Sequence, residues 1–143
     1  MRRTVISAGW IALVWTAIVL RAAEKAPEDY TAAMKQISAF VQAMTQPDAA
    51  QDFAKTKEFV PIVRDAFAVV ERYWLDRNQD RKYNAEIATA EEAIKFASDM
   101  GVAANLQSVE GIAASVKDIG ATCQPCHDRR REKGPEGFLI KLD

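Results

Sequence analysis

The sequence lacks an excess of charge of either sign. Its 19 lysines and arginines are balanced by 20 aspartates and glutamates, which leaves a net charge of -1. Proteins that bind nucleic acids need a clear basic excess to neutralise phosphates. We therefore expect no nucleic-acid partner for this chain. Its 143 residues are enough for one domain with a core of its own.

Signals for β-strands are also missing after residue 24, and no internal repeat is visible. Apolar residues instead recur in steps of three and four, as they do along one face of a helix. The expected fold class is therefore all-α, an antiparallel four-helix bundle formed by residues 25–143. The four predicted helices cover residues 27–44, 48–76, 84–100 and 108–133.

Proline and glycine predict where several of these helices begin and end. Pro27 suits the first turn of the first helix, because proline needs no N–H partner there. Pro61 predicts either a kink in the second helix or the start of a new one. Gly101 is expected to end the third helix, and Gly134 with Pro135 the fourth. The tail that follows is expected to pack loosely.

The N-terminus has the pattern of an export signal. Arg2 and Arg3 precede a mostly apolar run that extends to Leu20. This pattern predicts that residues 1–24 form either a signal peptide or an N-terminal membrane anchor. In both cases the arginines stay inside and the domain crosses the membrane, most simply into a bacterial periplasm. We expect an association with the membrane only if the segment is retained.

The residues that carry chemistry are gathered in one short motif. Cys123, Cys126 and the single histidine, His127, form the pattern C-x-x-C-H of covalent haem attachment. Two thiols at this spacing add to the two vinyl groups of the porphyrin, and the adjacent histidine reaches the iron. Cys123 and His127 share a helical face because they are four residues apart. The motif predicts one haem c per chain, attached near the C-terminal end of the fourth helix, with His127 as a metal ligand.

Other uses of this motif remain open. A structural zinc site normally takes four protein ligands, whereas the cysteines and the histidine supply three. A thioredoxin-like pair would belong in a βαβ setting, and the sequence predicts none. A disulfide between Cys123 and Cys126 is a further alternative, and it would make the chain a haem-free thiol–disulfide protein.

A predicted four-helix bundle with C-x-x-C-H near its C-terminus resembles the class II cytochromes c, the cytochrome c′ family. The resemblance covers residues 27–143. In the family the histidine is followed by two variable residues, then by an aromatic residue and then by a basic residue. Arg131 matches the basic position, which implies a cation against the proximal side of the haem, although a solvated arginine is equally consistent. Arg130 stands where the family has Tyr or Phe.

The resemblance also implies a sixth ligand for the iron. Low-spin members of the family use a methionine of the first helix, and Met34 with Lys35 resembles that pattern. Methionine is a soft thioether ligand that raises the reduction potential of haem iron. Met34 as a simple core residue is the alternative. Lys35 is implied as a partner of a haem propionate, or else is solvated. The expected walls of the haem pocket are Ile37, Phe40 and Val41.

These expectations predict a non-enzymatic function. The first hypothesis is a periplasmic monohaem cytochrome that transfers electrons to or from a redox partner protein, with His/Met-ligated iron. The second is a five-coordinate, cytochrome c′-like protein that binds NO or CO. Relatives often pair through their first two helices, so a homodimer is possible.

Overall fold

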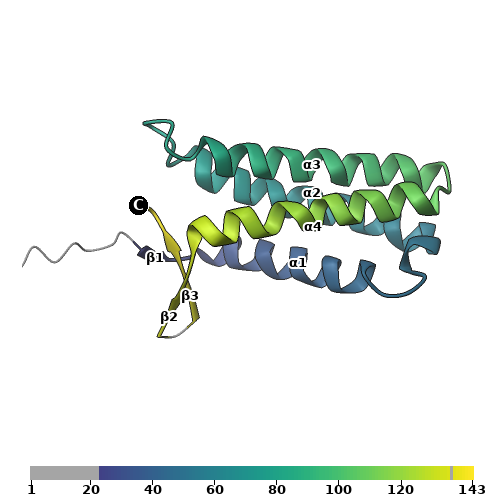
Figure 1. Ribbon diagram of the computed structural model, residues 1–143, viewed down its shortest axis with the longest axis horizontal. Coiled ribbons are helices and arrows are strands. Elements are labelled where there is room, and N and C mark those ends of the chain that lie inside the picture. Colours follow the sequence, from purple (N-terminus) through teal and green to yellow (C-terminus); the bar gives the residue numbers. More distant parts are fainter. Residues whose placement is uncertain (1–22, 136) are drawn as a thin grey trace, which may run out of the picture.

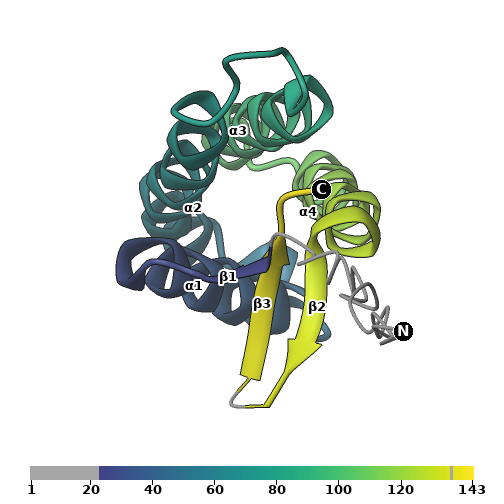
Figure 2. The ribbon, with the colours of Figure 1, turned by 90° about the vertical axis from the view of Figure 1, so that its left-hand side faces the viewer.

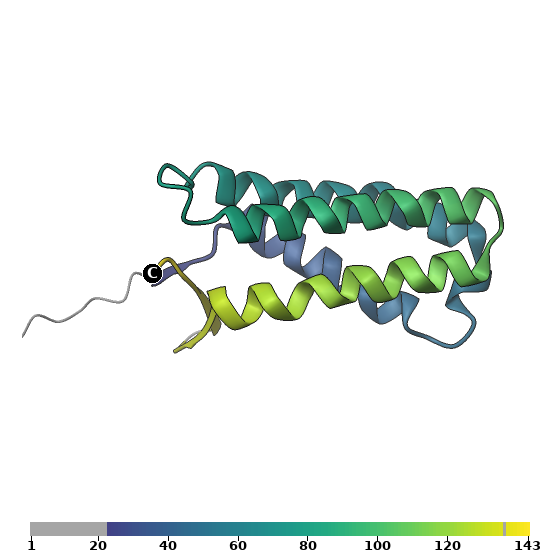
Figure 3. The same ribbon diagram turned by 45° about the horizontal axis from the view of Figure 1, so that its top comes forward.

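Four long helices dominate the computed structural model, which describes residues 23–135 and 137–143 (Figure 1). The connection between the second and third helices lies at the same end as the C-terminus, and the other two connections lie at the opposite end (Figure 3). The predicted mostly helical fold with four helices is therefore confirmed. The helices are α1 (Glu28–Met44), α2 (Phe53–Leu75), α3 (Asn84–Asn105) and α4 (Val109–Arg130), and the short 3-10 helix η1 (Ala49–Gln51) precedes α2.

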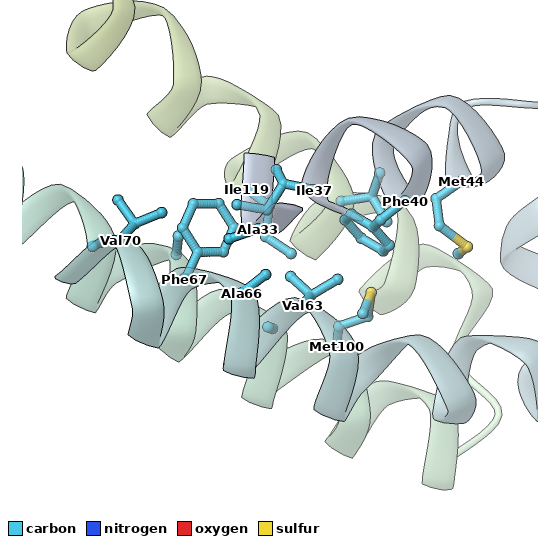
Figure 4. Close-up of a cluster of buried hydrophobic side chains, with 14 of the residues drawn as sticks. Ala33, Ile37, Phe40, Met44, Val63, Ala66, Phe67, Val70, Met100 and Ile119 are labelled. Atoms are coloured by element: carbon cyan, nitrogen blue, oxygen red, sulfur yellow. The ribbon is translucent and has the colours of Figure 1, made fainter. Parts of the chain in front are cut away.

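One apolar core runs between the helices, because each helix turns its stripe of apolar residues inward. Burying one such side chain contributes about 1.5–3 kcal/mol to folding. Helix α1 supplies Ile37 and Phe40, and α2 supplies Val63 and Phe67 (Figure 4). Met100 of α3 and Ile119 of α4 complete this part of the core.

The predicted end of the third helix is wrong. Helix α3 continues through Gly101 to Asn105, and Ala103 and Ala104 in this last turn are buried. A Cβ atom at Gly101 would lie 3.3 Å from methyl carbons of Val60, so this glycine allows α2 to approach closely and does not end the helix. Two alternatives were predicted at Pro61, and the start of a new helix is excluded because α2 is one helix with Pro61 inside it.

The predicted all-α class and the loose tail are wrong at the C-terminus, where α4 ends at Arg130 and the chain becomes extended. A small antiparallel sheet has the order β1-β3-β2 and lies at the end of the bundle, beside α1 and α4 (Figure 2). Ile140 in the middle of β3 is buried. The strands are β1 (Ala23–Lys25), β2 (Arg131–Gly134) and β3 (Gly137–Lys141).

Strand β1 begins the folded domain two residues before the predicted boundary. The Glu24 carboxylate accepts hydrogen bonds from the Tyr73 hydroxyl at 2.6 Å and from Arg77 Nη2 at 2.8 Å. These contacts fix β1 to α2. The predicted signal peptide or anchor otherwise falls on residues 1–22, which lie outside the described residues. Within residues 23–135 and 137–143, none of the helices has the length and apolar character needed to cross a membrane.

Candidate functional site at the end of helix α4

The two cysteines and the histidine lie along one side of the last turns of α4. Cys126 is buried and continues the core stripe of this helix, while Cys123 and His127 are half-buried beside it. The opposite flank of α4 packs toward α3, since Thr122 and Pro125 line a pocket together with α3 residues. Cys123 and His127 therefore lie on the flank of α4 that is turned toward α1.

Met34 lies on the flank of α1 that is turned toward α4. The Phe40 ring contacts Phe59 of α2, with ring centroids 5.6 Å apart, so that flank of α1 faces α2. Met34 and Val41 are on the other side of the core stripe, about 100° around the helix from Phe40. Both are half-buried and pack against the core, whereas Lys35 is exposed.

The heights of these residues along the bundle also match. Burial raises the pKa of the Tyr30 phenol, and the nearby Cys126 thiol raises it further, so Tyr30 is at the level of the cysteine motif. Met34 is one turn along α1 from Tyr30. Met44 is ten residues beyond Met34, about 15 Å farther along the axis. Only Met34 among the methionines of α1 is therefore near the level of His127.

The facing flanks of α1 and α4 are where a cofactor held by this motif would lie. Helices α1 and α4 touch far less than the other neighbouring pairs of helices do. Gly120 lies on the same flank of α4 as Cys123 and His127, and a Cβ atom built there would meet nothing within 4 Å. Open space therefore adjoins this flank of α4 one turn before Cys123, and Met34 lies on the facing helix.

The protonation states of the motif suit ligation better than thiol chemistry. Burial lowers the pKa of His127, and the Arg131 guanidinium lowers it further against the opposing effect of Asp128. A neutral imidazole, the form that binds a metal, is thereby favoured. Burial raises the pKa of Cys123, and burial with the Glu86 charge raises that of Cys126 to about 11. Both sulfurs are unpaired thiols in the structure.

An ion cluster that the sequence analysis missed holds the end of α4 to α3. The Glu86 side chain is 0% exposed, and its Oε1 accepts hydrogen bonds from Arg129 Nε at 2.8 Å and Arg130 Nε at 3.0 Å. Burial opposes ionisation of Glu86, but the two guanidinium groups outweigh it and lower its pKa. Glu86 Oε2 and the nearby Trp74 Nε1 are buried without a hydrogen-bond partner. No local pattern marks Glu86, because its partners are more than forty residues away.

We expect Glu86→Gln to lower the free energy of unfolding by about 3 kcal/mol at neutral pH, because two guanidinium groups lose a buried carboxylate. The folded-state pKa of Glu86 is below its ordinary value of 4.5. The stabilisation is therefore complete above that value and is lost as the pH falls through the lower, folded-state pKa. Urea unfolding at several pH values tests this, with the exposed Glu91→Gln as control. An equal loss at pH 3 and pH 7 would contradict the assignment.

The position of Arg131 differs from the prediction. It is not on the helical face of His127, because its backbone is extended (φ -100°, ψ 128°) and begins β2. Its N–H still donates to the His127 carbonyl, and its guanidinium lies 3.4 Å from the ring centroid of Phe138. Arg131 therefore stays beside His127, although on the hairpin rather than on the helix.

The remaining candidates are placed as follows. Ile37 and Phe40 are buried in the core, and Val41 is half-buried on the flank of α1 that carries Met34, two turns farther along. In the part of the chain that is described, no three His, Cys, Asp or Glu side chains converge as a metal ion held by them alone would require. No known protein family, curated protein or solved structure matches this chain significantly. The function must therefore be inferred from the site itself.

Proposed function

We propose that this chain is an exported c-type cytochrome that carries one covalent haem and transfers single electrons. The observation that carries the proposal is the placement of Cys123, Cys126 and His127 on the inner and α1-facing sides of α4, where these two helices make few contacts and Met34 lies on the facing flank of α1. When bound, haem supplies the one-electron chemistry of its iron. The periplasmic location, the redox partner protein and a homodimer remain predictions.

Each residue of the site has a separate task in this proposal. The thiols of Cys123 and Cys126 each add across one vinyl group, so that an S–C bond forms and the thiol hydrogen passes to the other vinyl carbon. His127 offers the neutral imidazole as the proximal ligand, and Met34 offers its thioether as the distal ligand. With both ligands kept in both oxidation states, little has to move during electron transfer. Val41 and Ile37 keep water from the distal side.

The thiol–disulfide alternative is disfavoured by the same residues. Redox-active cysteines are activated by a lowered pKa in a positive, accessible setting. Here burial raises the pKa of both thiols, and the Glu86 carboxylate raises that of Cys126 further. Thiols that stay protonated at neutral pH are weak nucleophiles. This environment suits cysteines that are modified once, during assembly, and then remain buried.

Extraction of the denatured protein with acidified organic solvent tests the proposal. We expect the haem to stay with the polypeptide, because two thioether bonds survive unfolding, and the optical spectrum of the native protein to be that of a low-spin haem. Haem that passes into the solvent, or a purified protein without any haem absorbance, would refute the proposal. A high-spin spectrum with covalent haem would instead favour the gas-binding alternative.

A further inference from the structure

An open pocket lies between the last turns of α4 and the β2–β3 hairpin, with a volume of about 390 Å³. In the sheet, Lys133 pairs with Phe138 and Arg131 with Ile140, so these side chains share one face of the hairpin. This face brings two cations and an aromatic ring to the outer side of His127. The pocket is lined by Gln124, His127, Asp128, Arg131, Lys133 and Phe138.

The hairpin is held in place by several independent contacts. Strand β3 pairs with β1, the Tyr83 hydroxyl donates to the Leu142 carbonyl at 2.8 Å, and Lys141 Nζ donates to the Asp128 carbonyl at 3.2 Å. The guanidinium of Arg131 is stacked on the Phe138 ring. The cation of Arg131 is therefore fixed at the pocket, and little conformational freedom remains to be lost when it binds an anion.

The arrangement of substituents on the porphyrin indicates which of its edges would point toward this pocket. Its two vinyl groups lie at the edge opposite its two propionates. Thioethers to Cys123 and Cys126 would place the vinyl edge along the core side of α4. His127 lies farther around the helix, away from the core stripe, and the pocket lies beyond His127 in the same direction. The propionate edge would therefore extend past His127 toward Arg131 and Lys133.

We propose that the hairpin pocket receives the haem propionates, with Arg131 and Lys133 as their cationic partners; this inference rests on the proposed function. Phe138 acts as a positioning residue that holds the Arg131 guanidinium by stacking. The pocket also contains one carboxylate, Asp128, but one of its oxygens already accepts a hydrogen bond from Gln124 Nε2 at 2.6 Å. Lys35, the partner implied by the family resemblance, is exposed on α1 and is outside this pocket.

Reduction potentials and resonance Raman spectra of the haem-loaded protein test this assignment at one fixed pH. A cation beside a propionate offsets the negative charge that stabilises ferric iron, so Arg131→Gln and Lys133→Gln should each lower the potential, and the double variant should lower it further. The propionate bending bands should shift as well. Lys57→Gln, which removes a cation from the exposed face of α2, should change neither.

Two further variants keep the test decisive. Arg131→Lys retains the charge and should recover most of the lost potential, whereas a purely structural role of the guanidinium would not be rescued. Lys133 is exposed, so Lys133→Gln should fold normally even if the Arg131 variants do not. The inference is overturned if the double variant keeps its haem with unchanged potential and bands, or if only Lys35→Gln shifts them. A chain without covalent haem overturns both proposals, and the extraction assay identifies that case first.

Discussion

The double variant Cys123→Ala, Cys126→Ala is expected to contain no covalently bound haem. Both sulfurs lie on the inner and α1-facing sides of α4, and they are the chain's only cysteines, so no other thiol can replace them. The haem content per chain should fall from one to zero, measured as the alkaline pyridine haemochrome of protein precipitated with acidified acetone. Each single variant should retain one thioether, with the absorption band displaced by the vinyl group left intact.

The controls separate attachment from folding. Lys117→Ala alters an exposed position of α4 outside the motif and the hairpin pocket, and it should leave the haem content at one per chain. The double variant should also melt at a lower temperature than the parent, because a ligand that binds only the folded state stabilises it. The region between α1 and α4, where these helices touch least, should loosen most. Full haem content in the double variant would show that the cysteines are not the attachment sites.

The helices, and the grouping of both cysteines with the histidine at the end of α4, could be predicted because their signals are local. Apolar residues at steps of three and four marked four helices, and the C-x-x-C-H residues lie within five consecutive positions, so helix geometry alone brings them together. Gly101 shows the limit of such signals. A glycine after an apolar stripe usually ends a helix, but here the close approach of Val60 explains the glycine.

The sheet and the buried ion cluster could not be predicted, because they join residues far apart in the sequence. Strand β1 pairs with β3 across more than a hundred residues, and strands of three to five residues are too short to show alternation. Glu86 resembles any acidic residue in the first turn of a helix. Its burial follows from the packing of that turn against Arg129 and Arg130.

The structure also changes the roles expected of two residues, Phe40 and Val41, that were predicted to line the haem pocket. Phe40 is 0% exposed and is already paired with Phe59 of α2, so it belongs to the permanent core more than to the facing flank. Val41 is half-buried on the same flank as Met34, two turns farther along α1. In the proposed site the distal side would be formed by Met34, Ile37 and Val41, which lie about one, two and three turns beyond Tyr30, and of these only Met34 carries a sulfur.

Met34→Ala is expected to convert the haem from low-spin to high-spin and to open the iron to CO and NO. If the Met34 thioether is the distal ligand, the parent ferric protein shows a weak sulfur-to-iron band in the far red and binds CO slowly, since the sulfur must first leave. Removing the sulfur should abolish that band and accelerate CO binding. The reduction potential should fall by on the order of 100 mV, a fraction of the about 0.8 V over which axial ligands tune haem iron.

Two other methionines provide matched controls for this prediction, because they are buried and lie farther along the bundle. Met44 is 6% exposed and Met100 is 0% exposed, and both pack near Phe40 and Val63 (Figure 4). Met44→Ala and Met100→Ala should each cost about 2–5 kcal/mol of stability through the cavity they leave. Their haem spectra and CO binding rates should nevertheless match those of the parent.

Met34 is only half-buried, so Met34→Ala should cost less stability than these two controls while changing the haem spectrum more. This opposite ranking distinguishes a ligand from a core residue. A parent protein that is already high-spin, or a Met34→Ala variant with the parent spectrum, would remove the support for electron transfer, and binding of small gases at the face of the haem toward α1 would become the leading function.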